Sequence, residues 1–258
     1  MANETVGFVG GGRITGIILD GLRRGGAVPA TVVVSDPAAA VLGKLKERHP
    51  GITATPDNAV AASQDVVFLA VHPPLMGEVL PKIAGNLKAG AIAVSLAPKF
   101  TIAKLSGLLG GFQRIARVIP NAPSVIGAGF NPVCFAAALS PAERQAVKDI
   151  VGAVGECPEV AEEKLEAYAV LAAMGPTYFW FQFEQLLSLG RSFGLTEGEA
   201  ATALEKMVTG AVETLTRSGL SPEQVKDLVP VKPLGEVEAS WAETYRGKLT
   251  AIYQKIKP

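Results

Sequence analysis

The stretch that decides the fold is VGFVGGGRITGIILDGL, residues 6–22. A short apolar run leads into three consecutive glycines, and a helical pattern begins at about Arg13. Gly10 and Gly12 take the first two positions of a G-x-G-x-x-G fingerprint, with Thr15 in the third. The first glycine permits a tight turn, and the second lets the backbone approach a pyrophosphate at the helix N-terminus. The stretch therefore predicts a dinucleotide site.

An acidic residue follows at the distance this motif requires. The next β-branched run, TVVVSDP (31–37), ends in Ser35 and Asp36, where an adenosine ribose would lie. A carboxylate there accepts hydrogen bonds from the 2′-hydroxyl and repels a 2′-phosphate, so we expect NAD(P)H as cofactor, with NADH favoured over NADPH. The alternative is that Asp36 only caps a helix beginning at Pro37, and both roles can coexist.

Apolar runs and helical segments alternate along the first part of the chain. The uninterrupted apolar character of the runs is typical of strands covered on both faces, which predicts an α/β fold with a Rossmann-type, doubly wound parallel sheet. A last helix over 140–155 and an edge strand at 157–160 complete this pattern. The expected strands are 5–10, 31–36, 65–71, 91–97, 114–120 and 132–138, and the expected helices are 12–24, 37–48, 75–87 and 101–109.

The pattern becomes almost purely helical after about residue 160. We therefore divide the chain into a dinucleotide-binding domain over 1–160 and an all-helical domain over 161–258. Thr196 and Ser221 are typical helix starts. The aromatic residues within 178–183 exceed what one core-facing stripe buries, so we expect dimerisation through this domain, with a large monomer core as the alternative.

Composition excludes several classes of protein. The 258 residues carry zero formal net charge and no basic run, which argues against nucleic acid or an anionic membrane as partner. No apolar run is long enough to span a bilayer, and the N-terminus lacks the pattern of a signal peptide. Two cysteines, Cys134 and Cys157, and two histidines, His49 and His72, make no disulfide framework or metal site. We expect a cytoplasmic protein without a metal.

A loop at 118–129, VIPNAPSVIGAG, holds one amide between two prolines. Pro120 and Pro123 fix the backbone on both sides of Asn121 just where a strand is expected to end. Such a rigid polar tip is a candidate ligand contact. The alternative is an ordinary tight turn in which Asn121 bonds its own backbone.

Taken together, these segments resemble the pyrroline-5-carboxylate reductase family over nearly the whole chain, in the same order. Residues 7–22 resemble its first strand, turn and helix, and 55–74 resemble its segment of asparagine, strand and proline. RVIPNAPSVIGAG (117–129) resembles its P-N-T-P stretch. The segments 163–181 and 221–240 resemble the opening of its helical domain and its P-G-G-T loop.

The resemblance implies hydride transfer from NAD(P)H to the C=N carbon of a cyclic imine, giving proline, and a helical domain that joins two subunits. It implies that Asn121 lies near the nicotinamide and substrate. It also implies a set of cofactor contacts: Gly10, Gly12, Arg13 and Ile14 at the pyrophosphate, Ser35 and Asp36 at the ribose, Asn58 near the adenosine, and Ala70, His72, Pro73 and Ala97 along the cofactor path.

The departures from the family fall on the substrate side. The family's S-G-S-G-P becomes Ala172-Ala173-Met174-Gly175-Pro176, and its P-G-G-T becomes Pro233-Leu234-Gly235-Glu236. The family's lysine before the proline at the end of the third strand becomes His72. Its alanine-glycine pair after the fourth strand becomes Ala97-Pro98-Lys99. These changes remove hydroxyl donors and add bulk and a negative charge.

We expect Met174, Gly175, Pro176 and Gly235 to contact the substrate. Glu236 is a candidate proton donor to the imine nitrogen, or else a solvated loop residue. Two alternatives stay open: a related oxidoreductase acting on a different imine or oxo compound, and a non-catalytic dinucleotide-binding protein.

Overall fold

The computed structural model describes residues 4–258 and divides into two compact units. The first, the Rossmann unit, comprises Met1–Met174 with Tyr253–Pro258, and the second, the helical unit, comprises Gly175–Ile252. The division by contacts thus falls at Met174, later than the boundary expected at residue 160. The domain limits themselves stay a prediction.

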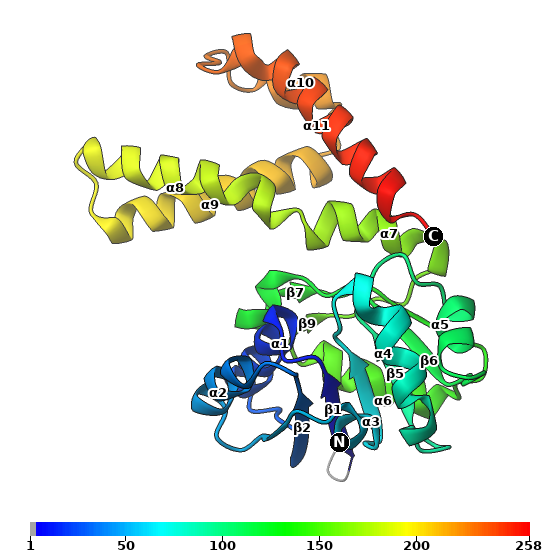
Figure 1. Cartoon of the computed structure of the whole chain (residues 1–258). Coiled ribbons are helices and arrows are strands. Elements are labelled where there is room, and N and C mark those ends of the chain that lie inside the picture. The colour runs from blue at the N-terminus through cyan, green and yellow to red at the C-terminus, as the bar shows by residue number, and fades with distance from the viewer. Residues whose placement is uncertain (1–3) are drawn as a thin grey trace. The chain divides into compact units, whose positions relative to one another are not determined.

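A seven-stranded sheet forms the centre of the Rossmann unit, in the order β3-β2-β1-β4-β5-β6-β8 (Figure 1). Neighbouring strands are parallel except β6 and β8, which pair antiparallel. The chain leaves β3 at one edge and returns to β4 beside β1, so the order reverses at that point. This is the doubly wound topology that the strand–helix alternation predicted. The strands are β1 (Thr5–Val9), β2 (Thr31–Ser35), β3 (Thr53–Thr55), β4 (Val66–Leu69), β5 (Ile92–Ser95), β6 (Ile115–Val118) and β8 (Val133–Phe135).

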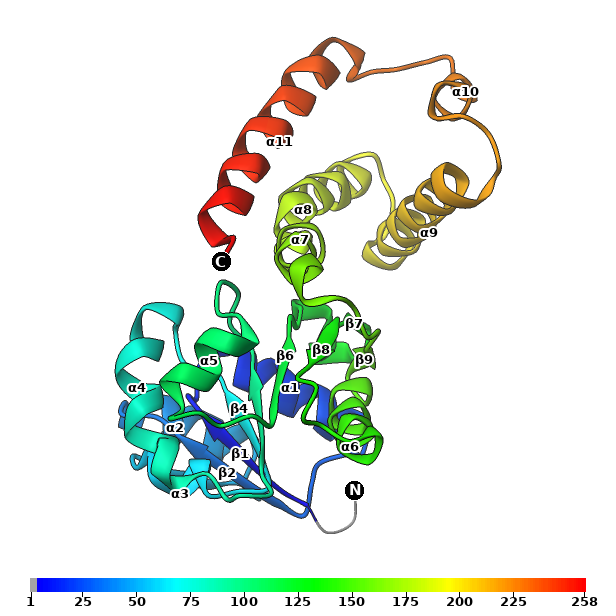
Figure 2. The same ribbon diagram turned by 90° about the vertical axis from the view of Figure 1, so that its right-hand side faces the viewer.

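Helices cover both faces of this sheet, as the apolar strands predicted. Phe8 and Phe68 stack on one face with their ring centroids 4.8 Å apart, within a core that includes side chains of α1, α2 and α6. Leu69 and Leu80 belong to the opposite core, to which α3, α4 and α5 contribute. Figure 2 shows α4 and α5 on one side of the sheet and α1 and α6 on the other. These helices are α1 (Arg13–Arg24), α2 (Ala39–Arg48), α3 (Asn58–Ala62), α4 (Met76–Ile83), α5 (Ile102–Leu108) and α6 (Pro141–Gly152).

Several short elements were not predicted, β3, α3, β7 and β9 among them, and one prediction is wrong. Strand β3 and helix α3 have three and five residues, too few for a periodic pattern to register. Strands β7 (Gly129–Phe130) and β9 (Gly155–Glu156) form a separate two-stranded sheet. The edge strand expected at 157–160 does not form, because this segment makes only an isolated bridge between Glu159 and Val133.

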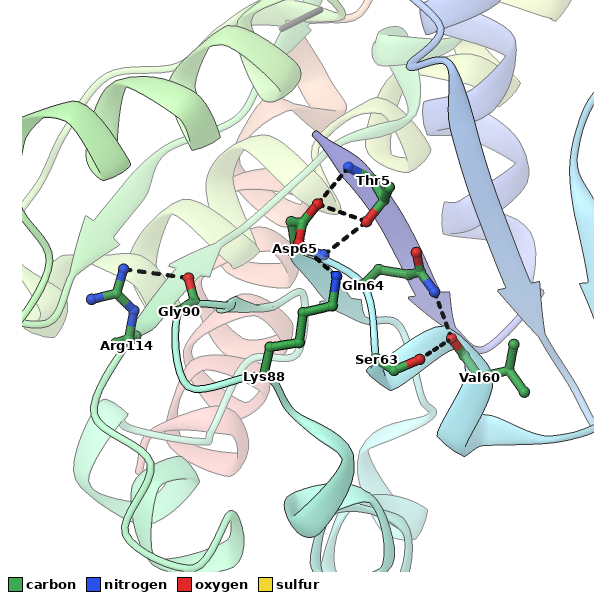
Figure 3. A network of polar contacts seen from close by, with 8 residues as sticks. All are labelled: Thr5, Val60, Ser63, Gln64, Asp65, Lys88, Gly90 and Arg114. Atoms are coloured by element: carbon green, nitrogen blue, oxygen red, sulfur yellow. Dashed lines mark hydrogen bonds and ion pairs between the residues drawn. The ribbon is translucent and has the colours of Figure 1, made fainter. Parts of the chain in front are cut away.

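An aspartate ties β1 to β4 at the edge of the sheet where these strands begin (Figure 3). The backbone N–H and hydroxyl of Thr5 donate to Asp65 Oδ2 at 3.0 and 2.8 Å, and Lys88 Nζ donates to Oδ1 at 2.7 Å. These bonds lower the pKa of Asp65 to about 2, with the Lys88 bond the largest cause. The carboxylate therefore contributes to the stability of the sheet while it is ionised.

The helical unit contains α8 (Pro176–Ser192), α9 (Glu197–Arg217), α10 (Pro222–Asp227) and most of α11 (Gly235–Ile256). Thr196 and Ser221 begin α9 and α10 with capping boxes, which confirms the predicted starts. No residue of α8 is buried, although its sequence is rich in aromatic residues. Among residues 4–258, no helix is long and apolar enough to cross a membrane.

Candidate functional site

The glycine turn after β1 has the backbone geometry that the fingerprint requires. Gly10 has φ = 109°, and a Cβ there would lie 2.6 Å from the carbonyl oxygen of Ala70. Side chains other than hydrogen are therefore excluded at this position. A Cβ on Gly12, in contrast, would meet nothing within 4 Å. The turn is closed at Gly10 and open at Gly12, where a ligand would approach the backbone.

Thr15 replaces the third glycine of the fingerprint without loss of packing. Its side chain is fully buried, and its hydroxyl donates to the carbonyl oxygen of Gly10 at 2.6 Å. The threonine therefore joins the first turn of α1 to the glycine turn and holds the turn's shape.

The N-terminus of α1 is free to bind an anion. Its N-cap residue, Gly12, makes no side-chain cap, and no acidic residue lies in the first turn. The N–H groups of this turn therefore lack the usual carboxylate or hydroxyl partner and carry the positive end of the helix dipole. A pyrophosphate oxygen is the kind of group that satisfies such an end.

Asp36 connects the end of β2 to the glycine turn. Its Oδ2 accepts the N–H of Gly11 and its Oδ1 the N–H of Ala38, both at 2.9 Å. Each carboxylate oxygen keeps a second lone pair for a ligand hydroxyl. Asp36 thus holds the start of the α2 segment and also lines the cleft described next, so the two roles weighed for it occur together.

Ser35, the last residue of β2, bonds to a residue that lines the cleft. Its side chain is fully buried, and its hydroxyl donates to Asn58 Oδ1 at 2.8 Å. Asn58 begins α3 and faces the cleft. The hydroxyl of Ser35 therefore orients Asn58, and the ribose contact expected of Ser35 stays a prediction.

These elements surround a cleft of about 560 Å³ at the carboxyl ends of the strands. The cleft lies where the strand order reverses between β1 and β4, the usual place for a ligand in a doubly wound sheet. Apart from Ser35, every residue expected to contact the cofactor lines it. These are Gly10, Gly12, Arg13, Ile14, Asp36, Asn58, Ala70, His72, Pro73 and Ala97.

Apolar residues that were not among the expected cofactor contacts complete the cleft. Leu75 and Val79 come from the segment after β4, and Leu96 and Pro98 from the loop after β5. Their position after strand ends was a usable signal, since the carboxyl ends of parallel strands meet at one edge of the sheet.

Asn121 has a different environment from the one its loop suggested. Its Oδ1 accepts the N–H of Phe130 at 3.0 Å, and its Nδ2 donates to the carbonyl oxygen of Ala172 at 3.4 Å. The residue is buried and is not among those that line the cleft. In the structure Asn121 ties its loop to β7 and to the π-helical segment Ala169–Ala173. Its catalytic role stays a prediction.

The residues expected to contact the substrate are divided between the two units. Met174 is the last residue of the Rossmann unit's main segment, whereas Gly175, Pro176, Gly235 and Glu236 belong to the helical unit. Gly235 and Glu236 open α11, and Glu236 is exposed. Their roles stay predictions.

A buried ion cluster supports the loop after β5. Arg117 on β6 is fully buried and pairs with Glu166, which is 2% exposed. Arg117 Nη1 also donates to Glu162 Oε1 at 2.9 Å. Sequence reasoning missed this cluster. The signal was one charged residue inside the otherwise apolar run IARVI, since a buried charge needs a partner of opposite sign.

Among the described residues, the two cysteines form no disulfide and the acidic residues form no metal-binding group. Cys134 and Cys157 are free thiols, and burial raises their pKa values to about 12 and about 11. Across residues 4–258, no group of three or more metal-binding side chains comes together.

Comparisons with known proteins agree with this arrangement of two units. A family model described as "NADP oxidoreductase coenzyme F420-dependent" matches residues 5–99, and one for pyrroline-5-carboxylate reductase dimerisation matches residues 162–256. The pyrroline-5-carboxylate reductase of Corynebacterium melassecola is 29% identical, with 86% of this chain and 83% of that protein aligned. Over most of its length the chain is similar to pyrroline-5-carboxylate reductases.

Solved structures of the family share the fold. The pyrroline-5-carboxylate reductase of Coxiella burnetii has a TM-score of 0.70 at 28% identity, covering 98% of this chain and 94% of that one. The Plasmodium falciparum pyrroline carboxylate reductase, solved with NADP bound, has a TM-score of 0.83 at 23% identity, covering 100% and 98%. The latter likeness concerns the fold alone. Both matches extend over the Rossmann and the helical unit of this chain.

Proposed function

We propose that this protein is an NAD(P)H-dependent reductase of a cyclic imine, with pyrroline-5-carboxylate as substrate and proline as product. The observation that carries the proposal is the cleft at the switch point, which combines an open Gly12, an uncapped α1 N-terminus and Asp36. The relatives named for this reaction match both units of the chain. We place the protein in the cytoplasm, because its two cysteines form no disulfide framework and a reducing compartment suits free thiols.

The donor set of the cleft fits a dinucleotide. The backbone N–H groups at Gly12, Arg13 and Ile14 suit a pyrophosphate, and the Arg13 guanidinium adds a positive charge on the same side. Asp36 would accept a ribose hydroxyl, and Asn58 would lie near the adenosine. Ala70, His72, Pro73 and Ala97 would form the walls toward the reacting end.

We infer that NADH is the preferred cofactor. A 2′-phosphate near Asp36 would face a carboxylate whose hydrogen bonds to Gly11 and Ala38 fix it in place. Like charges at such a distance oppose binding. No arginine or lysine follows Asp36 on the α2 side before Lys44.

When bound, NAD(P)H would supply the hydride that adds to the C=N carbon, while the nitrogen takes up a proton. We propose Glu236 as the donor of this proton and Met174, Gly175, Pro176 and Gly235 as substrate contacts. Asn121 would act from the loop after β6, either on the ligands or through its bonds to Phe130 and Ala172.

The protein would work as a homo-oligomer joined through its helical unit. Trp180 and Phe181 on α8 are 53% and 58% exposed, and large apolar side chains on α9 and α11 are exposed as well. Aromatic surfaces of this extent are typical of interfaces between subunits. A second copy of the chain is the partner that this surface suits.

The test is oxidation of NADH and NADPH with pyrroline-5-carboxylate and with carboxylate-free 1-pyrroline. We expect turnover of the carboxylated imine. Turnover of another imine or oxo compound alone would favour a related oxidoreductase. Tight cofactor binding without any turnover would favour a non-catalytic dinucleotide-binding protein.

A variant pair tests the cofactor cleft itself. Gly12→Val places two methyl groups in the open space where the backbone would meet the pyrophosphate. We expect the KM for NADH to rise at least about tenfold, or about 1.4 kcal/mol, without loss of thermal stability. Gly43→Val, at an α2 glycine that also has no neighbour within 4 Å, is the matched control. Equal cofactor affinity in both variants would refute the cleft assignment.

A further inference from the structure

Lys99 has a backbone conformation that a lysine rarely adopts. Its φ is 75°, and among the described residues it is the one non-glycine residue with a positive φ. This conformation places Cβ against the following carbonyl group, so it persists only where the surroundings enforce it. Lys99 directly follows Ala97 and Pro98, which line the cleft.

The buried ion cluster is what enforces this conformation. The N–H of Lys99 donates to Glu166 Oε1 at 3.1 Å, and the N–H of Ile102 donates to Glu162 Oε1 at 2.6 Å. Both carboxylates are paired with the fully buried Arg117. The two ends of the 99–102 loop are thus fixed to one charged cluster, which holds the loop in a single conformation.

The loop lies at the far end of the cleft from the ribose residue. Asp36 follows β2 and Lys99 follows β5, which stand three places apart in the sheet. At about 4.8 Å per strand this separates the two ends by roughly 14 Å, the scale of a bound dinucleotide. The loop after β5 is therefore at the end where the nicotinamide and substrate would lie.

The side chain of Lys99 is available to a ligand. It is exposed, and within residues 4–258 no carboxylate pairs with its ammonium group. The segment 172–176, which we expect to contact the substrate, reads Ala-Ala-Met-Gly-Pro and has no side-chain hydrogen-bond donor that could bind a small carboxylate. An ammonium on a long stem supplies three donors and a charge.

We propose that Lys99 binds the carboxylate of the substrate and that Glu166, through the Lys99 backbone, is its positioning residue. This inference rests on the proposed function for the identity of the substrate. It makes Lys99 the residue that discriminates a carboxylated cyclic imine from an uncharged one.

Lys99→Gly separates the charge from the fold, because glycine adopts φ = 75° without strain. We expect KM for pyrroline-5-carboxylate to rise about tenfold to a hundredfold, the size of a lost charged hydrogen bond. The kcat, the KM for NADH and the kinetics with 1-pyrroline should stay within about twofold, well below that loss. Lys99→Arg should restore most of the affinity, and Lys104→Gln, which removes a neighbouring charge on α5, should have no effect. Equal losses with both imines, or no loss at all, would overturn the proposal.

A binding measurement distinguishes failure of this inference from failure of the proposed function. L-proline and pyrrolidine differ only in the carboxylate, and calorimetry in the presence of NAD⁺ measures each. If no imine is reduced but Lys99→Gly weakens proline and spares pyrrolidine, the proposed function fails and the carboxylate site stands. If imine turnover is normal and proline binding is unchanged in Lys99→Gly, the carboxylate site fails alone.

Two variants of Glu166 test positioning. Glu166→Gln keeps an oxygen acceptor for the Lys99 N–H, whereas Glu166→Ala removes it. We expect Glu166→Ala to raise KM for the carboxylated imine in the way Lys99→Gly does, and Glu166→Gln to retain more of the affinity. If Glu166→Ala does not fold, the KM of the double variant Glu166→Gln/Lys99→Gly tests whether Glu166 acts through Lys99. Any additional effect of Glu166→Gln on KM in the Lys99→Gly background would contradict action through Lys99.

Discussion

The two units of this protein treat their aromatic residues in opposite ways. In the Rossmann unit Phe8 and Phe68 are stacked and wholly inaccessible to solvent, whereas Trp180 and Phe181 of the helical unit are about half exposed. The strands of the sheet are covered on both faces, but α8 buries none of its residues. The Rossmann unit therefore completes its own core, and the helical unit needs a surface from another chain to complete its core.

The polar groups repeat this contrast. The Rossmann unit buries an arginine and a glutamate as a pair, and such groups are tolerated only where each has its partner. The ion pairs of the helical unit, such as Lys226–Glu238, lie on its surface with both side chains more than half exposed. Charged side chains thus contribute to the buried interior of the Rossmann unit, whereas those of the helical unit mainly face the solvent.

The largest effect is expected where the Rossmann unit is most self-sufficient. Arg117→Met leaves Glu166 buried without a counter-charge and should lower the free energy of unfolding by about 3–5 kcal/mol, measured by urea denaturation. Lys82→Met removes an exposed pair with Glu78 and should change the free energy of unfolding far less. Adding Glu166→Gln to Arg117→Met should recover part of the loss. A double variant no more stable than the single one would contradict this account.

A charge on the exposed helical surface tests the other side of the comparison. Trp180→Glu should weaken self-association about a hundredfold, or about 2.7 kcal/mol, because a desolvated aromatic contact would become a buried charge. Light scattering after gel filtration measures the mass over a dilution series. Val60→Glu, at a 40% exposed apolar position of the Rossmann unit, is the control and should leave the oligomer intact. Equal mass for the two variants would break the contrast between the units.

The sequence was most informative where one residue type alone satisfies the backbone. Gly10 requires a positive φ and a Cβ-free approach to Ala70, and this single need fixes the turn, the strand before it and the helix after it. The continuous apolar runs predicted the doubly wound sheet for a similar reason, since covered strands have no polar face. The capping boxes at Thr196 and Ser221 likewise marked helix starts with local chemistry.

The sequence was least informative where tertiary contacts decide. The sequence of its loop did not indicate that the Asn121 amide bonds to residues 9 and 51 positions away in the chain. Lys99 carries no local signal for a left-handed backbone, because the buried carboxylate of Glu166 imposes it across 67 positions. The edge strand expected at 157–160 is reduced to one bridge between Glu159 and Val133, and the regular pairing here involves the two preceding residues, since Gly155 and Glu156 of β9 pair with β7.

Cofactor choice should depend on the Rossmann unit alone. Asp36→Asn keeps one acceptor oxygen for the two backbone N–H groups, of Gly11 and Ala38, and removes the charge opposed to a 2′-phosphate. The ratio of kcat/KM for NADH to that for NADPH should fall about tenfold, or about 1.4 kcal/mol. Asp57→Asn, which caps the neighbouring α3 and retains that cap, is the control. An unchanged ratio in Asp36→Asn would remove cofactor discrimination from this end of the cleft.

The smallest effect is expected at the sheet edge where β1 and β4 begin (Figure 3). The folded-state pKa of Asp65 is lowered from 3.8 to about 2, so its contribution is present above pH 3.8 and is lost as the pH falls through 2. Because the side chain is 39% exposed, solvent screening limits this contribution to about 1 kcal/mol. Asp65→Asn should therefore be less stable than the parent protein at pH 7 and closer to it at pH 3, by urea denaturation at each pH. If Asp65→Asn loses the same stability at both pH values, the effect belongs to the Thr5 hydrogen bonds. The charge would then contribute no more at this edge of the Rossmann unit than on the solvated surface of the helical unit.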